Sequence, residues 1–414
     1  MTRDERQEII LNKFKNNNYV GGFEGVTGFG KTITALKIIR EYKPKSLLIV
    51  VPSEKLKEDW ISHLKRWKIK GDVLIINTAY KLVKKYDMLV VDEAHRSVSE
   101  EFVTLYDNIN YIKLVWFSAI IKRQDGRESL LLARAPILDT VTLEEALQYD
   151  WVAPFEVTKI PVLLTEEEKI SHNKLNNEYE RIVEELGYGN PMKNASFYIS
   201  YLDMRKWRIG KISNKVLFIK TIEKKLHENN VKLSDYTKMI DTYFHKPTKE
   251  HEYYKKAILA KKFYQIVAKR KDLLYNAKNK LSKTLSLIDE YKYQYKFVFA
   301  QRIDFLQELS KHLPSDEVRL YHSKMKKKDK ETSFKTFNDG RTKVKTMLSV
   351  KSLVEGIDIP KLSTSIITSF DSSKINKIQT WGRNIRKYKN KKVNIIYLYV
   401  PDTQEEVWLN KLQI

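Results

Sequence analysis

The chain has no cysteine, few glycines and prolines, and no long apolar run. Its 414 residues include only 13 glycines and 10 prolines. The lack of cysteine excludes disulfides and thiolate zinc sites, and the eight histidines show no spacing typical of metal ligands. So little glycine and proline argues against a long flexible linker. Because no signal peptide, transit peptide or membrane-spanning run is recognisable, we expect a cytoplasmic protein that makes no use of a membrane.

Positive charge is in large excess and is unevenly distributed. The formal net charge is +24. Residues 191–283 hold 23 Lys and Arg against eight Asp and Glu, a surplus of 15 that exceeds half of the total. A plain solvated lysine surface would spread this charge along the chain. Its concentration favours a polyanionic partner, of which nucleic acid is the commonest.

A glycine-rich segment between an expected strand at 22–26 and an expected helix at 33–40 fits the pattern G-x-x-x-x-G-K-T. Glycines allow backbone N–H groups to turn around phosphate oxygens, at φ values closed to most side chains. The Lys31 side chain can reach the β- and γ-phosphates, and the Thr32 hydroxyl can bind Mg²⁺. A chance glycine-rich turn is the alternative, and the strand and helix on either side argue against it. The nucleotide-binding residues expected here are Gly25, Thr27, Gly28, Gly30, Lys31 and Thr32.

A second segment, Asp92-Glu93-Ala94-His95, follows an apolar run typical of a buried parallel strand. Asp92 at the strand end suits Mg²⁺ held partly through water. Glu93 suits the group that orients or deprotonates an attacking water. An acidic surface turn is the alternative, but the buried strand and the upstream phosphate loop favour a catalytic pair. Both segments together predict hydrolysis of a nucleoside triphosphate.

The pattern of apolar runs predicts two α/β lobes with a helical section between them in the chain. Residues 1–164 alternate between strands and helices, with runs at 46–52, 72–77, 88–92 and 113–118. Residues 165–292 are lysine-rich and follow a helical period, beginning with a capping box at Thr165. Residues 293–414 return to alternation, with strands expected at 297–300, 319–322, 345–349, 364–368 and 393–397. We therefore expect two parallel-sheet lobes and a basic helical insertion.

With these motifs in this order, the sequence resembles the superfamily-2 helicases over nearly its whole length. The resemblance implies two RecA-like lobes, ATP as the nucleotide, Mg²⁺ as its metal, and a nucleic acid as partner. The matching segments are 3–7 (upstream adenine-reading segment), 25–32 (motif I), 51–53 (Ia), 77–80 (Ib/Ic), 92–95 (II), 118–119 (III), 299–302 (IV), 349–360 (V) and 379–386 (VI).

Motif VI, Q-x-x-G-R-x-x-R, is the most specific of these segments together with motif V. Arg383 and Arg386 lie three apart, which places them on one helical face where guanidinium groups match phosphate oxygens. The resemblance implies that both reach the γ-phosphate across the cleft between the lobes. It also implies that Gln7 contacts the base and that the remaining nucleotide-site residues are Gly356, Asp358 and Gln379.

Motif III departs from the family pattern. Ser118-Ala119 is followed by Ile120-Ile121, so the second hydroxyl of the usual S/T-A-T is missing. The resemblance therefore supports ATP hydrolysis more firmly than its coupling to strand movement. Phosphate contacts along a nucleic acid, independent of base sequence, are implied for Pro52, Ser53, Thr78, Arg302, Ser323, Ser349 and Lys351.

Several functions are compatible with these motifs. The segments 122–126 and 149–155 are similar to those of DNA repair and branch-migration helicases, including the compact UvsW-like phage enzymes, and imply single-stranded, duplex or branched DNA as substrate. A phage enzyme would act in the host cytoplasm, and we expect a monomer. An RNA helicase on the same core is one alternative. A nucleic-acid-binding scaffold with a decayed ATPase is another, against which the intact motif residues argue.

Overall fold

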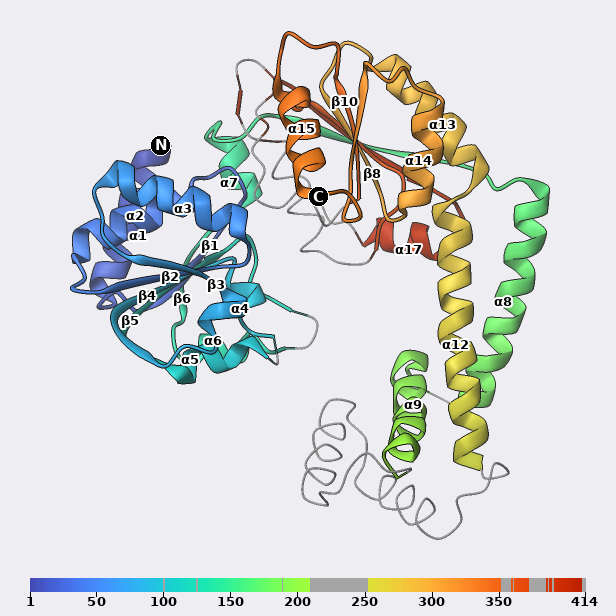
Figure 1. Ribbon diagram of the computed structural model, residues 1–414, viewed down its shortest axis with the longest axis horizontal. Helices are drawn as coiled ribbons and strands as arrows, with labels where there is room; N and C mark the ends of the chain where they lie inside the picture. Colours follow the sequence, from blue (N-terminus) through green and yellow to red (C-terminus); the bar gives the residue numbers. More distant parts are fainter. Residues whose placement is uncertain are drawn as a thin grey trace. The chain divides into compact units, whose positions relative to one another are not determined.

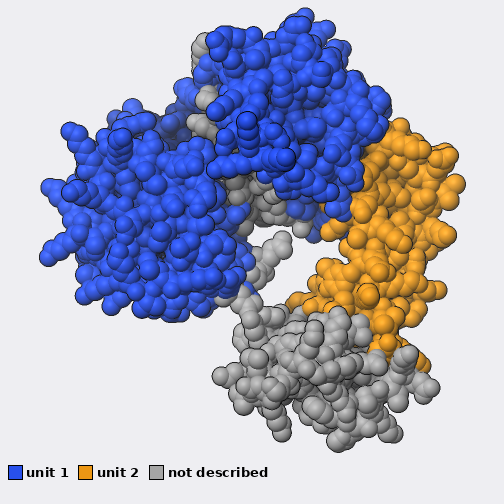
Figure 2. Space-filling view, viewed as in Figure 1, with its two compact units in different colours: residues 1–162, 282–414 blue, residues 163–281 orange. Residues whose placement is uncertain are grey.

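The computed structural model describes residues 1–99, 101–123, 126–187, 189–208, 252–350, 359, 361–371, 385, 387–388 and 391–411. The chain divides into two compact units (Figure 2). Unit 1 comprises residues 1–162 and 282–414 and contains both sheets, whereas unit 2 comprises residues 163–281. No helix among the described residues is both long enough and apolar enough to span a bilayer.

The first sheet of unit 1 has six parallel strands in the order β3-β2-β4-β5-β1-β6. Its central strands are almost entirely buried, as expected for a parallel sheet covered on both faces. The strands are β1 (Gly21–Gly25), β2 (Leu47–Val51), β3 (Asp72–Ile75), β4 (Lys84–Asp92), β5 (Ile109–Ser118) and β6 (Ile137–Val141).

Helices cover this sheet (Figure 1). The side chains of α1, α2 and α3 pack in one apolar cluster, and those of α4, α5 and α6 pack in another. Two short 3₁₀ turns lie at Ala94–Arg96 and Phe102–Thr104. The α-helices are α1 (Arg3–Asn16), α2 (Lys31–Tyr42), α3 (Glu54–Trp67), α4 (Ile76–Ala79), α5 (Leu105–Asn108), α6 (Ser129–Leu132) and α7 (Leu143–Gln148).

The second sheet also has six parallel strands, in the order β7-β12-β11-β8-β10-β9. The expected first lobe, residues 1–164, therefore includes a strand, β7, that pairs in the second sheet. The elements are β7 (Phe155–Pro161), β8 (Lys296–Ala300), α14 (Ile303–Lys311), β9 (Val318–Tyr321), α15 (Lys327–Asn338), β10 (Thr346–Val350), β11 (Thr364–Ile367), β12 (Val393–Tyr399) and α17 (Gln404–Asn410).

Two all-parallel, helix-covered sheets confirm the predicted fold class of two RecA-like lobes. The strand runs expected from the sequence all form strands, and the helix expected at 54–67 spans those residues. The strands of both sheets end at edges that carry the motifs. Glu24 of β1 is level with Ser118 of β5, and Asp92 of β4 is level with Phe117. In the second sheet Ala300 is level with Val350, which brings motifs IV and V to one edge.

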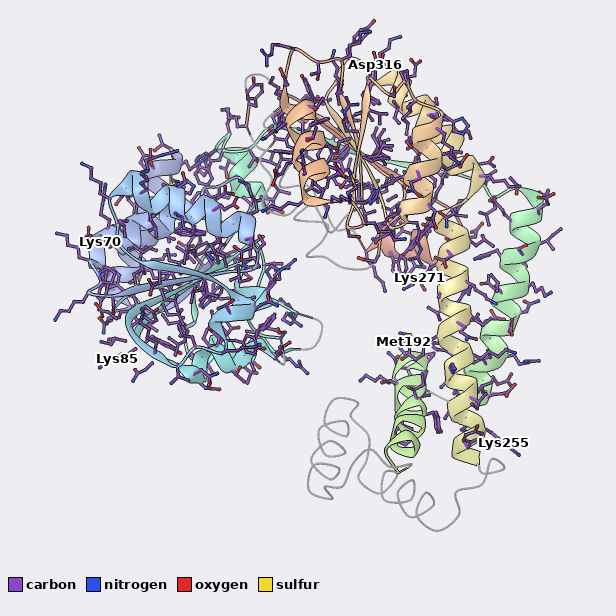
Figure 3. All side chains as sticks on the ribbon, viewed as in Figure 1. Lys70, Lys85, Met192, Lys255, Lys271 and Asp316 are labelled. Atoms are coloured by element: carbon purple, nitrogen blue, oxygen red, sulfur yellow. The ribbon has the colours of Figure 1, made fainter. Side chains whose placement is uncertain are left out.

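Unit 2 is helical. It contains α8 (Glu166–Leu186), α9 (Pro191–Arg208), α12 (Glu252–Tyr275) and the start of α13 (Lys278–Glu290). The predicted capping box forms, because the Thr165 hydroxyl accepts from the Glu168 N–H and the Glu168 carboxylate accepts from the Thr165 N–H. Helix α12 packs against α8 and α9 around Phe263. Lys255 and Lys271 lie near the two ends of α12 (Figure 3).

Candidate functional site

The phosphate loop follows β1 and leads into α2 with the backbone geometry that its glycines permit. Gly28 has φ 93° and Gly30 has φ 100°, both in the left-handed region that side chains rarely adopt. Helix α2 begins directly after Gly30, so its first N–H groups belong to the loop. A helix N-terminus with free N–H groups and a positive dipole end favours an anion. Thr27 and Thr32 are half-buried on this loop.

Lys31 is held inside the loop. Its Nζ donates to the carbonyl oxygen of Gly25 over 3.0 Å, and the side chain is buried. A Cβ added at Gly25 would lie 3.2 Å from Lys31 Cγ, which is tighter than most Cβ contacts, so the lysine side chain would have to shift. A lysine bonded to a neutral carbonyl is free to exchange that partner for a phosphate oxygen, which is a stronger, charge-assisted acceptor.

Gln7 on α1 lies against the same loop. A Cβ added at Gly30 would lie 2.9 Å from Gln7 Nε2. Gln7 is only 2% exposed, and its Oε1 atom is buried without a hydrogen-bond partner. A buried orphan acceptor is costly unless a ligand completes it. The amide therefore offers an unused acceptor next to the phosphate loop, as a base contact requires.

A buried ion pair fixes the helix that carries Gln7. The Arg6 guanidinium donates to both carboxylate oxygens of Asp139 on β6, over 2.6 and 2.8 Å, and to Glu145 over 2.6 Å. Burial alone would raise the pKa of Asp139, but hydrogen bonds from Arg6 and Lys13 outweigh it and hold the pKa below its ordinary value. Because the planar guanidinium group contacts both carboxylate oxygens, it fixes the position and the rotation of α1 relative to the sheet.

We expect Arg6→Ala to lower the free energy of unfolding by about 3–5 kcal/mol, because it leaves the Asp139 carboxylate buried without its main partner. Lys13→Ala is the matched control. Lys13 contacts the same carboxylate over 3.0 Å but is 46% exposed, so its loss should cost less than about 1 kcal/mol. Urea unfolding of both variants measures the difference. Equal losses would show that Arg6 does not anchor α1.

Asp92 ends β4 in a buried position. It is 7% exposed, and its Oδ2 atom accepts from the indole Nε1–H of Trp60 over 2.9 Å. Burial, followed by the neighbouring charge of Glu93, raises the pKa of Asp92 above its ordinary value, while Trp60 and Lys31 act in the opposite direction. The carboxylate thus has less positive charge around it than its ionised form needs, and a bound cation would supply it.

Glu93 adopts a left-handed backbone conformation, with φ 49° and ψ 51°. A non-glycine residue in this region is strained, and such strain concentrates at functional sites. Its Oε2 atom is buried without a hydrogen-bond partner and lies 3.4 Å from His95 Nδ1. The side chain therefore keeps acceptor capacity for a water molecule.

His95 connects motif II to motif III. Burial lowers the pKa of His95 to about 4, so the ring is neutral at pH 7. Its Nδ1 atom lies 2.9 Å from the Ser118 hydroxyl, and that hydroxyl donates to the Ile120 carbonyl over 2.8 Å. Because the hydroxyl hydrogen is used on Ile120, Ser118 accepts from His95. The single hydroxyl that motif III retains is therefore engaged at the end of β5.

The altered part of motif III has its own anchor. The backbone N–H of Ile121 donates to the Glu24 carboxylate over 2.6 Å, and the Ile121 side chain is 2% exposed. Arg123 donates to the carbonyl oxygen of His95 over 2.8 Å. Hydrogen bonds thus join Glu24, next to motif I, and His95 of motif II to the residues that follow motif III, although the second hydroxyl is missing.

The oxygen donors at this edge fit Mg²⁺. Mg²⁺ prefers oxygen ligands, keeps several waters, and is usually bound by one or two carboxylates together with substrate phosphates. Asp92 provides an undercompensated carboxylate, and Thr32 provides a hydroxyl at the start of α2. Among the residues that the structure describes, no three His, Asp or Glu side chains gather into a metal site, so the phosphates of a substrate would have to complete the coordination.

A short segment after α7 contacts motif I on one side and Ile385, within motif VI, on the other. The rings of Phe29 and Trp151 lie 5.3 Å apart, and Trp151 is 3% exposed. Two residues later, the N–H of Ala153 donates to the carbonyl oxygen of Ile385 over 2.7 Å. Lys387 also pairs with Asp150. Residues 150–153 therefore hold the phosphate loop and the chain around Ile385 at once.

The expected nucleic-acid contacts differ in accessibility. Thr78 and Ser323 are exposed, and Pro52 and Ser53 are half-buried at the start of α3, where the Ser53 hydroxyl accepts from the Leu56 N–H. Arg302 is half-buried at the start of α14. Ser349 is fully buried, and its hydroxyl donates to the Val350 carbonyl. The remaining expected site residues lie outside the described part of the chain: Lys351, Gly356, Asp358, Gln379, Arg383 and Arg386.

Three residues that contact these motifs were not predicted as site residues. Trp60 contacts Asp92, Glu24 contacts Ile121, and Arg123 contacts His95. Glu24 directly precedes the phosphate loop, and this position in the sequence was the one feature that could have indicated a residue near the site. Trp60 follows an i, i+4 apolar pattern with Leu56 and Leu64 that indicates only core packing.

Two family models match parts of the chain, and solved structures resemble it in fold. Residues 278–388 match the helicase conserved C-terminal domain, and residues 3–80 match the type III restriction enzyme, res subunit. The crystal structure of the Pyrococcus furiosus Hef helicase domain is similar in fold, with a TM-score of 0.55 and 15% identity over 99% of this chain and 98% of that chain. No curated protein matches the sequence.

The two matched domain models support a superfamily-2 helicase, and the solved structure supports the fold alone. The matched helicase domains imply an enzyme that hydrolyses ATP in a nucleic-acid-dependent manner, with a divalent metal that is generally Mg²⁺. Lys31, Asp92 and Glu93 lie at one edge of the first sheet, and Gln7 lies on α1 beside the phosphate loop.

Proposed function

We propose that this protein is an ATP-dependent DNA helicase or translocase acting in repair, recombination or the remodelling of branched DNA. The observation that carries the proposal is the gathering of Lys31, Asp92 and Glu93 at one edge of the first sheet. Each of these side chains keeps an interaction that a nucleotide would complete. A structural ion-pair network would leave no such capacity.

In this mechanism Lys31 leaves the Gly25 carbonyl and takes a β- or γ-phosphate oxygen, while the loop N–H groups bind the remaining oxygens. Thr32 and Asp92 would hold Mg²⁺, which would supply positive charge to the phosphate groups. Gln7 contacts the base. By the resemblance to the superfamily-2 helicases, Arg383 and Arg386 would reach the γ-phosphate, and Gly356, Asp358 and Gln379 would belong to the nucleotide site.

Glu93 positions the water that attacks the γ-phosphate. Its strained backbone fixes the carboxylate at the end of β4, and its unsatisfied Oε2 atom accepts a hydrogen bond from that water. His95 contributes no positive charge at neutral pH because burial lowers its pKa to about 4. The carboxylate of Glu93 therefore faces a neutral ring and keeps its Oε2 atom for a hydrogen bond from the water.

The two lobes would close when ATP binds and open after hydrolysis, and each lobe in turn would bind the nucleic acid more tightly. ATP would drive this change by shifting the populations of the two states. Contacts at Pro52, Ser53, Thr78, Arg302, Ser323 and Lys351 go to phosphates in this proposal and so do not depend on base sequence. Ser349 is left out because its side chain is fully buried. The net charge of +24 supports a polyanionic binding partner such as a nucleic acid. DNA is favoured over RNA by the resemblance of residues 122–126 and 149–155 to the repair and branch-migration helicases.

ATP hydrolysis should be stimulated by DNA, and most strongly by branched DNA. The measurement compares steady-state hydrolysis with single-stranded DNA, duplex DNA, a four-way junction and sequence-matched RNA, each at several salt concentrations. Because the contacts are to phosphates, log apparent affinity should fall linearly with log salt, with a slope of roughly −0.7 to −0.9 per phosphate neutralised.

The outcomes of this comparison separate the alternatives. Stronger stimulation by RNA would replace the DNA assignment with an RNA helicase. Binding to DNA without any hydrolysis would indicate a scaffold whose ATPase has decayed. Salt-independent stimulation would contradict the phosphate contacts themselves.

A further inference from the structure

We propose that Trp60 is a positioning residue for the metal site, holding one carboxylate oxygen of Asp92 so that the other serves the hydrated cation. The inference rests on the proposed ATPase function and adds to it a residue outside the helicase motifs. Trp60 lies on α3, seven residues after Ser53 at the start of that helix. It acts on the nucleotide only through Asp92.

The contact is specific in its atoms. Trp60 is 1% exposed, and its indole has a single donor, Nε1–H, which is directed to Asp92 Oδ2 over 2.9 Å. The ring packs against Phe117, with 6.0 Å between centroids. Phe117 is level with Asp92 in the neighbouring strand β5. The indole is thus clamped between α3 and the sheet at the end of β4.

The chemistry explains why tryptophan occupies this place in the core. A phenylalanine would fill an apolar position without a polar atom, whereas a buried indole N–H must find an acceptor. Here the acceptor is one oxygen of a buried carboxylate, so the indole holds that oxygen in place.

The hydrogen bond also restricts rotation of the carboxylate about the Cβ–Cγ bond. A carboxylate with one oxygen fixed presents the other in a defined direction, which lowers the cost of ordering it when the cation binds. Groups that orient metal ligands in this way commonly change metal affinity by 10- to 100-fold when they are removed.

Trp116 provides a matched control in the same lobe. It is fully buried, and its indole N–H donates to the Ala135 carbonyl over 2.8 Å. Trp116 belongs to the apolar cluster on the other face of the sheet from Trp60. Trp116→Phe therefore loses the same donor and the same volume without touching Asp92.

The test measures binding of a fluorescent ADP analogue to the full chain, in EDTA and across a Mg²⁺ titration. Trp60→Phe should need about tenfold more Mg²⁺ for half of the metal-dependent gain in ADP affinity, while its affinity in EDTA stays that of the parent. Trp116→Phe should change neither quantity. The urea midpoints of both variants measure the loss of stability that replacing a buried tryptophan by phenylalanine causes in each.

The outcomes distinguish this inference from the proposed function. A parent chain that does not bind ADP would overturn the nucleotide site itself. A parent with a metal-dependent gain that Trp60→Phe leaves unchanged would overturn only the role of Trp60. Equal weakening of ADP binding in EDTA and in Mg²⁺ would assign Trp60 to packing and also overturn the inference.

A second measurement keeps the inference testable if Trp60→Phe does not fold. The parent chain has seven tryptophans, so labelling with ¹⁵N-tryptophan gives few indole resonances, assignable with single substitutions at the others. Adding Mg²⁺ to the ADP complex should move the Trp60 indole resonance and leave that of Trp116 in place. An unmoved Trp60 resonance would overturn the proposed contact.

Discussion

Lys31→Ala is expected to lower the rate of ATP hydrolysis by about 100- to 1,000-fold, because the ammonium group stabilises charge on the transferring phosphoryl group. In the structure Lys31 is buried, and its Nζ atom donates to the neutral Gly25 carbonyl. Its removal should therefore leave the fold intact. Steady-state hydrolysis with saturating DNA measures the loss, and the urea midpoint checks the fold.

Lys37→Ala on the same helix is the control for this experiment. Lys37 pairs with Asp4 and Glu8 on α1 and has no contact with the phosphate loop. Its loss should change stability slightly and hydrolysis hardly at all. If Lys31→Ala hydrolyses ATP as fast as Lys37→Ala does, residues 25–32 do not bind the nucleotide.

Glu93→Gln should separate binding from chemistry. The amide keeps the size of the carboxylate but cannot take a proton, so hydrolysis should fall by about 100- to 10,000-fold while ADP and ATP bind as tightly as before. Single-turnover hydrolysis and equilibrium binding with the fluorescent nucleotide measure the two properties separately. A variant that binds nucleotide poorly would show that Glu93 organises the site and does not position water.

Glu101→Gln is the matched substitution at an exposed carboxylate of the same lobe. Glu101 accepts a hydrogen bond from the Tyr80 hydroxyl over 2.6 Å, away from β4 and the phosphate loop. We expect full hydrolysis from it. A comparable loss in both variants would indicate a general effect of removing negative charge from this very basic chain.

Local patterns in the sequence were sufficient for most of the fold. Apolar runs of four to six residues identify buried parallel strands because both faces of such strands are covered. The capping box at Thr165 sets the start of α8 by itself, since its two hydrogen bonds lie within four residues. The phosphate loop was equally local, and its positive φ values at Gly28 and Gly30 follow from the glycines.

The features that the sequence did not indicate depend on partners far away in the chain. β7 is an edge strand with charged and half-exposed residues, so it shows no apolar run, and its pairing with β12 spans more than 200 residues. Arg6 and Asp139 are 133 residues apart. Trp60 has the spacing of an ordinary core residue. None of these sequence patterns identifies the distant residue that each of them contacts, because the contact forms only when the chain folds.

The segment at 150–153 has a mechanical consequence. Only two peptide steps separate Trp151, whose ring lies on Phe29, from Ala153, whose N–H holds the Ile385 carbonyl. Two steps of extended backbone span about 7 Å, and both side chains are almost fully enclosed. A connection this short cannot lengthen further. A displacement of the Phe29 ring would therefore act on Ile385, which lies between Arg383 and Arg386 in the sequence.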